Sequence, residues 1–304
     1  VMKVDCFYNR DSITGLKELP PNSIHAIVSD IPYGIDYADW DTIHSNTNKA
    51  LGGSSDAQLK NPLFKRRGKP LNGWSEADRL RPLEYQKWVS TWAGEWVRII
   101  KPGGSVFVFA GRQFSHRVIV AFEEAGFTFK DMLSWERDKA PHRAQRLSKI
   151  YERREDVENE NKWIGWRVAN LRPLFEPILW FQKPYKTGGT IASNVLENGV
   201  GAWNERSLLK WNKHQNSLNQ SNIIKVDVLT DDRKYHVTQK PLNLMKLLIE
   251  LVTIEQQIVL DPFAGSATTL LAAKELNRKY IGYEKDFEIY KVGKERLNQS
   301  HFKI

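Results

Sequence analysis

Short apolar runs rich in β-branched and aromatic residues recur along the chain and predict buried strands. They cover residues 3–8, 25–30, 105–110, 127–135, 177–182, 257–261 and 280–284. Helical periods separate many of them, including a tryptophan every fourth residue from Trp88 to Trp96 and apolar repeats at 241–252 and 268–277. This alternation predicts an α/β fold with a doubly wound, mostly parallel sheet and helices on both faces.

Two parts of the chain lack this alternation. Residues 38–82 are polar, whereas residues 137–172 and 184–235 are rich in Arg, Lys, Asn and Trp without a clear period. Loops of such length inside a compact domain are usually functional or disordered. We therefore expect them to be insertions on the α/β scaffold.

Positive charge is concentrated in two of these segments. The net charge is +9, while residues 60–69 carry five basic residues and no acid, and residues 137–154 carry seven basic and two acidic residues. The rest of the chain is close to neutral. Such clusters favour a polyanionic partner such as DNA or RNA, because phosphate neutralisation releases counterions. Solvated surface loops are the alternative.

The first residues and the cysteine content indicate a reducing compartment. Residues 1–10 contain no apolar signal core, and no apolar run approaches the roughly 20 residues that cross a bilayer. Cys6 is the single cysteine, which excludes an internal disulfide and a CxxC metal pair. We expect a cytoplasmic protein without a membrane partner.

Three stretches carry candidate chemistry, and the first is Ser-Asp-Ile-Pro-Tyr-Gly at residues 29–34, directly after an apolar run. The second, residues 258–276, combines a strand, a turn of small residues and a helix, which brings backbone N–H groups close to a ligand. Glu284 follows Asp261 by 23 residues, a distance that suits an acceptor for ribose hydroxyls. The turn lacks GxGxxG, which disfavours an NAD-dependent oxidoreductase.

The third stretch, residues 235–245, places Thr238, Gln239 and Lys240 at the start of a predicted helix. Side-chain and backbone donors at such a position can hold a small carboxylate. The alternative is an ordinary helix start with Pro241 in its first turn.

Together the three stretches resemble the motifs of S-adenosylmethionine-dependent DNA amino-methyltransferases. Residues 29–34 look like their D-P-P-Y motif, residues 261–269 (DPFAGSATT) like D-P-F-x-G-S-G-T-T, and residues 236–241 (HVTQKP) like H-P-T-Q-K-P. The catalytic motif comes first and the cofactor loop lies near the C-terminal end, an order similar to that of the permuted β class. The resemblance spans most of the chain and implies a Rossmann-like methyltransferase fold.

The resemblance also implies an activity. A motif that begins with Asp usually marks enzymes that methylate the exocyclic N6 amine of adenine in double-stranded DNA, by direct in-line attack on S-adenosylmethionine after base flipping. An N4-cytosine enzyme and a catalytically inactive DNA-binding relative remain the alternatives. The family further implies a bacterial or phage-encoded protein, a cognate restriction endonuclease and a homodimer as partners to test.

By resemblance, the catalytic residues are Asp30, Ile31, Pro32 and Tyr33. The Asp30 carboxylate and the Ile31 carbonyl are expected to accept hydrogen bonds from the amine of the flipped base, and Tyr33 to stack on that base. An aromatic amine is a poor nucleophile because its lone pair is delocalised into the ring. Two acceptors hold the nitrogen nearer to tetrahedral and stabilise the positive charge that develops, without a metal or a covalent intermediate.

The cofactor residues implied by the resemblance lie in separate parts of the chain. The turn after residue 261 is expected to hold the methionine and sulfonium end, the acid at 284 the ribose, and residues 236–240 the methionine carboxylate. Asp11 occupies the place of an acid that contacts the adenine amine, with a helix N-cap as its alternative role. The full set is Asp11, His236, Thr238, Gln239, Lys240, Asp261, Phe263, Ala264, Gly265, Ser266, Ala267, Thr268 and Glu284.

Recognition of the DNA sequence is expected in the insertions, whose cations can pair with base edges or phosphates. The candidate DNA-binding residues are Lys65, Arg66, Arg67, Arg143, Arg146, Arg153, Arg154, Lys210 and Lys213. We therefore divide the chain into three regions. They are a catalytic half (1–136, with an insertion at 38–82), target-recognition insertions (137–235) around a core strand at 173–183, and a cofactor-binding half (236–304).

Three positions depart from the family pattern. Ile31 stands in place of the first proline of the catalytic motif, Val237 in place of the proline after His236, and Ala267 in place of the second glycine of the cofactor loop. Ile31 lacks the fixed φ of proline, and Ala267 adds a methyl group where the backbone needs positive φ or close contact with a ligand. These substitutions bear on turnover more than on the fold.

Overall fold

The structure is a computed structural model that describes residues 2–34, 41, 43, 76–140, 144–214, 220–229, 232 and 239–299. Within these ranges the strands are β1 (Cys6–Asn9), β2 (Ile24–Asp30), β3 (Ile100–Phe109), β4 (Thr128–Glu136), β5 (Phe175–Gln182), β6 (Ile223–Ile224), β7 (Ile258–Asp261) and β8 (Lys279–Glu284). The helices are α1 (Ser12–Leu16), α4 (Glu76–Ile99), α5 (Ser115–Ala125), α6 (Leu147–Glu152), α7 (Val157–Lys162), α8 (Ile191–Asn198), α9 (Glu205–Trp211), α10 (Leu242–Val252), α11 (Thr268–Glu275) and α12 (Phe287–Gln299).

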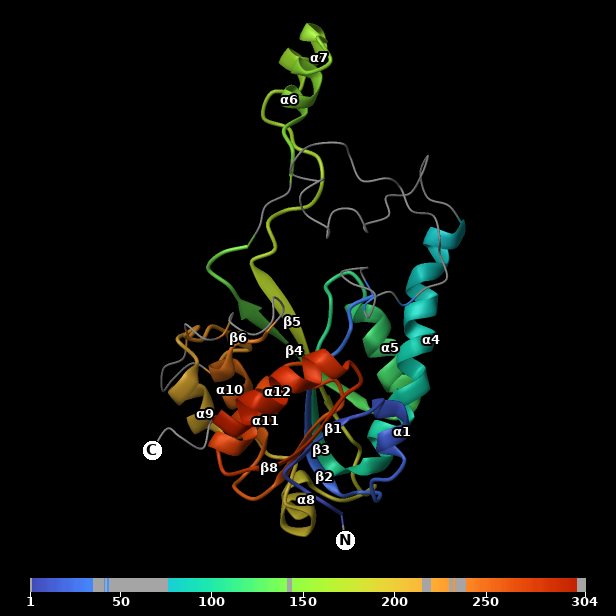
Figure 1. Ribbon diagram of the computed structural model, residues 1–304, viewed down its shortest axis with the longest axis vertical. Helices are drawn as coiled ribbons and strands as arrows, with labels where there is room; N and C mark the ends of the chain where they lie inside the picture. The colour runs from blue at the N-terminus through green and yellow to red at the C-terminus, as the bar shows by residue number, and fades with distance from the viewer. Residues whose placement is uncertain are drawn as a thin grey trace.

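All of these strands join one sheet in the order β1-β8-β7-β2-β3-β5-β4-β6. The strands from β1 to β3 in this order are mutually parallel, β5 runs antiparallel to both of its neighbours, and β6 pairs with β4 in parallel. Helices cover both faces of the sheet (Figure 1). The predicted α/β class with a mostly parallel sheet is confirmed.

Each of the predicted strand runs forms a strand. The short strand β6 was not predicted, because two residues carry no period of their own. β3 begins at Ile100, earlier than expected, and its residues 101–104 bulge against β2, where the register shifts between Ile24 and Ala26.

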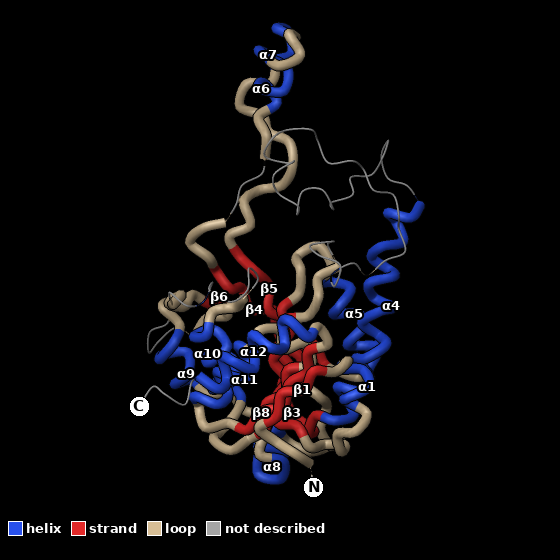
Figure 2. Tube along the Cα trace, in the orientation of Figure 1, coloured by secondary structure: helices blue, strands red, loops and turns tan. Residues whose placement is uncertain are grey.

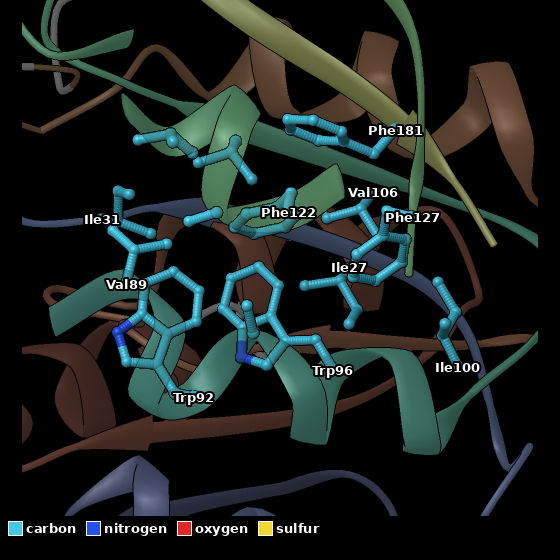
Figure 3. Close-up of a cluster of buried hydrophobic side chains, with 14 of the residues drawn as sticks. Ile27, Ile31, Val89, Trp92, Trp96, Ile100, Val106, Phe122, Phe127 and Phe181 are labelled. Atoms are coloured by element: carbon cyan, nitrogen blue, oxygen red, sulfur yellow. The ribbon is translucent and has the colours of Figure 1, made fainter. Parts of the chain in front are cut away.

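One face of the sheet is covered by α1, α4 and α5, and its core is strongly aromatic. Trp92 and Trp96 of α4 are fully buried and pack edge-on against Phe122 of α5, and Figure 3 shows these rings with the aliphatic side chains of the sheet. Trp88 is partly buried at the same cluster. The predicted tryptophan stripe of α4 is therefore a core element.

The opposite face is covered by α9, α10 and α11. Buried leucines of α10, such as Leu244 and Leu248, pack with Ala272 of α11 and Leu208 of α9 against the sheet. The strand β2 is followed by α4 on the first face, and β7 is followed by α11 on the second. The chain therefore reverses its winding between the neighbouring strands β2 and β7, the position at which open α/β sheets bind their ligands.

The expected insertions contribute different structures. Residues 144–172 form an arm that leaves the sheet between the end of β4 and the start of β5 and carries α6 and α7 far from the body (Figures 1 and 2). Within residues 184–235, α9 packs on α10, while α8 lies near the opposite end of the molecule from the arm (Figure 1). α4 begins at Glu76, inside the range 38–82.

Candidate active site

The carboxyl ends of the central parallel strands bring the first two sequence motifs together. Asp30 ends β2, Asp261 ends β7 and Glu284 ends β8. The hydroxyl of Ser29 donates a buried hydrogen bond to Asp261 Oδ1 over 2.7 Å. The catalytic motif and the cofactor loop therefore meet where the winding reverses between β2 and β7.

The Asp30 carboxylate lies in a compact network of polar side chains. Its Oδ2 accepts a hydrogen bond from Lys240 Nζ at 2.7 Å, and its Oδ1 lies 2.9 Å from the hydroxyl of Tyr33. Glu176 at the start of β5 contacts the same Tyr33 hydroxyl through Oε1, which also lies 3.0 Å from Lys240 Nζ. Since β5 is antiparallel to β3, its first residues reach the same edge of the sheet as Asp30.

Burial and the mutual fields of these groups shift their protonation. Burial raises the pKa of Asp30, with Glu176 adding to the rise and Lys240 opposing it. Burial also disfavours the charged forms of Glu176 and Lys240, but their attraction outweighs it, so the pKa of Glu176 is lowered and that of Lys240 is raised. The Asp30 side chain keeps 25% of its surface exposed, which leaves it open to a ligand.

Packing and hydrogen bonds hold the loop after Asp30. The side chain of Ile31 is buried in the aromatic core and only 2% exposed, so packing anchors the position at which the family pattern has proline. Tyr85 of α4 donates to the Pro32 carbonyl at 2.7 Å, and the Gly34 N–H donates to Asp41 at 2.8 Å. The loop is thus fixed despite the loss of the proline ring.

The cofactor loop between β7 and α11 leaves space for a ligand beside Gly265. Its N–H donates to Glu284 Oε2 at 3.0 Å, and Gly265 has a φ of +51°. A Cβ built at this glycine meets no atom within 4 Å. A backbone without a side chain, an open space and an acid that faces it fit the ribose and methionine parts of S-adenosylmethionine.

Ala267 adopts the backbone conformation anticipated from the sequence. Its φ is +65°, in the left-handed region that favours glycine, and its methyl group is fully buried. Gly293 of α12 lies against it, because a Cβ at that glycine would stand 3.0 Å from the Ala267 Cβ. The loop therefore accepts alanine through close packing with the last described helix.

Arg296 is a further residue at the cofactor loop, and the sequence motifs did not indicate it. This buried side chain of α12 donates through Nη1 to Ser266 Oγ and Thr268 Oγ1, each at 3.1 Å, and to the Ser266 carbonyl. An arginine on the buried side of an amphipathic helix was the only sequence signal. These hydrogen bonds from α12 hold the side chains of Ser266 and Thr268 in place.

Other predicted cofactor residues have structural partners. The Phe263 ring packs 5.4 Å from that of Trp92, and Asp11 caps α1 by accepting from the Thr14 N–H at 3.3 Å. Ala264 is buried in the loop, and Gln239 lies directly before Lys240. Lys240 itself was expected to hold the methionine carboxylate, whereas its ammonium lies on Asp30 and Glu176. His236 and Thr238 lie outside the described residues.

The predicted DNA-binding residues fall into separate places. Arg146, Arg153 and Arg154 are exposed on the arm. Lys210 is paired with Glu250 at 3.1 Å on α10, and Lys213 is paired with Asp227. The other candidates lie outside the described residues: Lys65, Arg66, Arg67 and Arg143.

Known proteins are similar to this chain along nearly its whole length. A family model described as DNA methylase, N6_N4_Mtase, matches residues 24–295. The type II methyltransferase M.HindIII of Haemophilus influenzae is 71% identical over 294 residues, which cover 97% of this chain and 95% of that protein. The chain belongs to the DNA methylase family.

Two solved structures share the fold of this DNA methylase. The complex of M1.HpyAVI with S-adenosylmethionine has a TM-score of 0.54 and 22% identity, and the match covers 96% of this chain and 98% of that one. The cytosine-N4-specific PvuII DNA methyltransferase has a TM-score of 0.60 and 17% identity, with coverage of 98% and 87%. These matches confirm the predicted Rossmann-like methyltransferase fold. As a family member, this DNA methylase uses S-adenosylmethionine as its methyl donor.

Two further observations concern the described part of the chain alone. No helix there is both long and apolar enough to span a bilayer. Nor do three His, Cys, Asp or Glu side chains within the described ranges come together as a metal-binding group.

Proposed function

We propose that this DNA methylase transfers a methyl group to the exocyclic N6 amine of adenine in duplex DNA, after the base has left the stack. The observation that carries the proposal is the placement of Asp30. Its carboxylate lies at the end of β2. The preceding residue, Ser29, donates a hydrogen bond to Asp261 at the end of β7, and a quarter of the Asp30 side-chain surface is exposed. An acceptor for an amine and the site of a methyl donor are thereby neighbours.

Asp30 and the Ile31 carbonyl orient the amine of the flipped base. As the nitrogen attacks, positive charge develops on it, and a fixed carboxylate in a site with little water stabilises that charge strongly. Lys240 holds Asp30 in place, since its ammonium group donates to Asp30 Oδ2 at 2.7 Å. Tyr33 offers a ring for stacking, which contributes roughly 1–3 kcal/mol per base toward the cost of leaving the duplex.

The other half of the site belongs to the cofactor. S-adenosylmethionine supplies the electrophilic methyl group when it is bound. Glu284 accepts hydrogen bonds from the ribose hydroxyls, Gly265 and Ser266 face the methionine end, and Asp11 remains the proposed contact of the adenine amine. The open space at Gly265 and the support of the loop by Arg296 favour this assignment.

The choice of adenine rests on the motif that begins with Asp30. The chemistry at the N6 amine of adenine and the N4 amine of cytosine is nearly the same, and Asp30 suits either. Cytosine is therefore the second candidate. The departures at Ile31 and Ala267 raise the further alternative of an inactive relative, but buried packing of Ile31 and the accommodated φ of Ala267 favour an active enzyme.

The arm of residues 144–172 is the proposed site of sequence recognition. It leaves the sheet at the edge that carries Asp30, and Arg146, Arg153 and Arg154 on it are exposed. Exposed cations suit phosphates and guanine edges. Because M.HindIII is a type II methyltransferase, we further propose that this enzyme protects DNA beside a cognate restriction endonuclease.

One experiment separates the candidate activities. Purified protein is incubated with S-adenosylmethionine and mixed-sequence unmethylated DNA, the DNA is digested to nucleosides, and methylated nucleosides are identified by mass. Detection of N6-methyladenine supports the proposal. Detection of N4-methylcytosine shows that the target base is cytosine and leaves the proposed mechanism of methyl transfer unchanged. The absence of both, with cofactor binding demonstrated, supports the inactive relative.

A further inference from the structure

Glu176 has contacts that the assigned catalytic motif does not explain. It is the second residue of the apolar strand β5, its side chain is only 12% exposed, and it contacts three polar groups. They are the Tyr33 hydroxyl, Lys240 Nζ at 3.0 Å and Arg137 Nη1 at 3.5 Å. A buried carboxylate with so many partners is costly to keep unless it is paired, and it lies directly beside the proposed reaction site.

We propose that Glu176 is a positioning residue that holds the Tyr33 hydroxyl and thereby keeps Asp30 free to accept the amine of the target base. The inference rests on the proposed function and adds to it a residue outside the four-residue catalytic motif. Glu176 acts through Tyr33 and does not itself contact the reacting atoms.

The Tyr33 hydroxyl has a single hydrogen to donate. The Tyr33 hydroxyl lies within hydrogen-bond distance of both Asp30 Oδ1 and Glu176 Oε1, but a phenol carries a single hydrogen. It donates fully to one carboxylate at a time. When it donates to Glu176, the lone pairs of Asp30 Oδ1 remain for the base.

The charges around Glu176 favour that state. Lys240 donates to Asp30 Oδ2 and also contacts Glu176, while Arg137 approaches Glu176 from the arm side of the sheet. Two cations therefore face Glu176 and keep it ionised as an acceptor. Lys240 Nζ also lies 3.1 Å from the Tyr33 oxygen, which directs the phenol hydrogen away from the ammonium and toward a carboxylate.

A double-mutant cycle tests this link. Glu176→Gln, Tyr33→Phe and the double variant are compared with the wild type in single-turnover methyl transfer at saturating DNA and S-adenosylmethionine. In Glu176→Gln the acceptor at residue 176 is a neutral amide, so the Tyr33 hydroxyl donates instead to the charged Asp30, and we expect the rate to fall by about ten- to hundredfold. In the Tyr33→Phe background the competing hydroxyl is gone, so the same substitution is expected to cost roughly threefold or less.

Glu275→Gln is the matched control. Glu275 of α11 pairs with Lys246 at 2.6 Å and lies outside the proposed site, so its loss is expected to change the rate by less than about twofold. An unchanged rate in Glu176→Gln overturns the inference. An equal loss in both Tyr33 backgrounds also overturns it, because Glu176 then does not act through the hydroxyl.

The same cycle in urea unfolding tests the contact without turnover. Non-additive midpoints for Glu176 and Tyr33 support the hydrogen bond on which the inference depends, and additive midpoints overturn it. If the wild-type protein methylates no base, that result contradicts the proposed function and not the role of Glu176. The two failures are thus distinguishable.

Discussion

The hydroxyl of Ser29 donates to the carboxylate of Asp261 over 2.7 Å, although 232 residues separate them in the chain. Ser29 precedes the proposed catalytic residue Asp30 on β2, and Asp261 precedes the proposed cofactor loop at the end of β7. The same Asp261 oxygen accepts from the Phe263 N–H at 3.1 Å. One buried carboxylate therefore links strand β2, which carries Asp30, to the loop after β7 that is proposed to bind the cofactor.

Removal of this link is expected to affect both stability and cofactor binding. Ser29→Ala leaves a buried carboxylate with one donor fewer, which costs about 1–3 kcal/mol of unfolding free energy. Ser207→Ala is the matched control, since Ser207 is equally buried and donates to the Leu247 carbonyl at 2.9 Å, away from the site. Urea unfolding should show losses of similar size, whereas isothermal titration should show weaker S-adenosylmethionine binding only in Ser29→Ala. Equal cofactor affinities in the two variants contradict the link.

Asp261 also predicts a dependence of stability on pH. Burial raises the pKa of Asp261 to about 7, although hydrogen bonds such as that from Ser29 oppose the shift. A carboxyl group with a raised pKa binds more protons in the folded than in the unfolded protein, so its stabilising contribution is present at low pH and is lost as the pH rises through 7.

The variant Asp261→Asn removes that dependence. Between pH 5 and 7, the wild type is expected to lose stability relative to the variant by up to about 1.4 kcal/mol per pH unit. Urea unfolding at half-unit steps of pH measures the difference. Parallel curves for the two proteins contradict the raised pKa.

Gly265 provides a test of the cofactor site. Gly265→Ala places a methyl group in open space, so the fold suffers only the strain of a φ of +51°, about 1 kcal/mol, while the methyl group occupies the proposed ligand space. Gly188→Ala is the control, because Gly188 has a φ of +78° and equally open surroundings away from the site. Calorimetry should show S-adenosylmethionine binding at least about tenfold weaker in Gly265→Ala alone. Equal binding by the two variants places the cofactor elsewhere.

The substitution Lys240→Met distinguishes two possible roles of this lysine, support of Asp30 and binding of the methionine carboxylate. If its ammonium serves Asp30, as the 2.7 Å contact indicates, Lys240→Met lowers kcat and leaves the KM for S-adenosylmethionine nearly unchanged. If it holds the methionine carboxylate, KM rises and kcat changes little. Lys246→Met is the control for loss of a lysine ion pair, since Lys246 lies on α10 and pairs with Glu275 at 2.6 Å outside the proposed site. We expect a lower kcat with a nearly unchanged KM for S-adenosylmethionine.

The sequence predicted the strands other than β6 because each contains a short run rich in apolar, β-branched and aromatic residues. β6 and the helices of the arm escaped prediction, since they are short and lie in segments without a period. The motif residues Asp30, Asp261 and Glu284 were found because each follows such a run.

Glu176 and Arg296 were missed for different reasons. Glu176 enters the site only because β5 runs antiparallel to β3, and the direction of a strand is not written in its apolar pattern. Arg296 reaches the cofactor loop from α12, 30 residues further along the chain than Ser266. The contacts of both residues depend on the topology of the fold and not on the local sequence pattern.

The proposed reaction depends most on Asp30, which accepts a hydrogen bond from the amine that is methylated. The most direct test of that role is methyl incorporation into DNA by Asp30→Ala under single-turnover conditions, with Asp131→Ala, a partly buried aspartate of β4, as control. We expect a loss of at least about a hundredfold for Asp30→Ala with S-adenosylmethionine and DNA binding retained, and no loss for the control. A rate near that of the wild type in Asp30→Ala contradicts it.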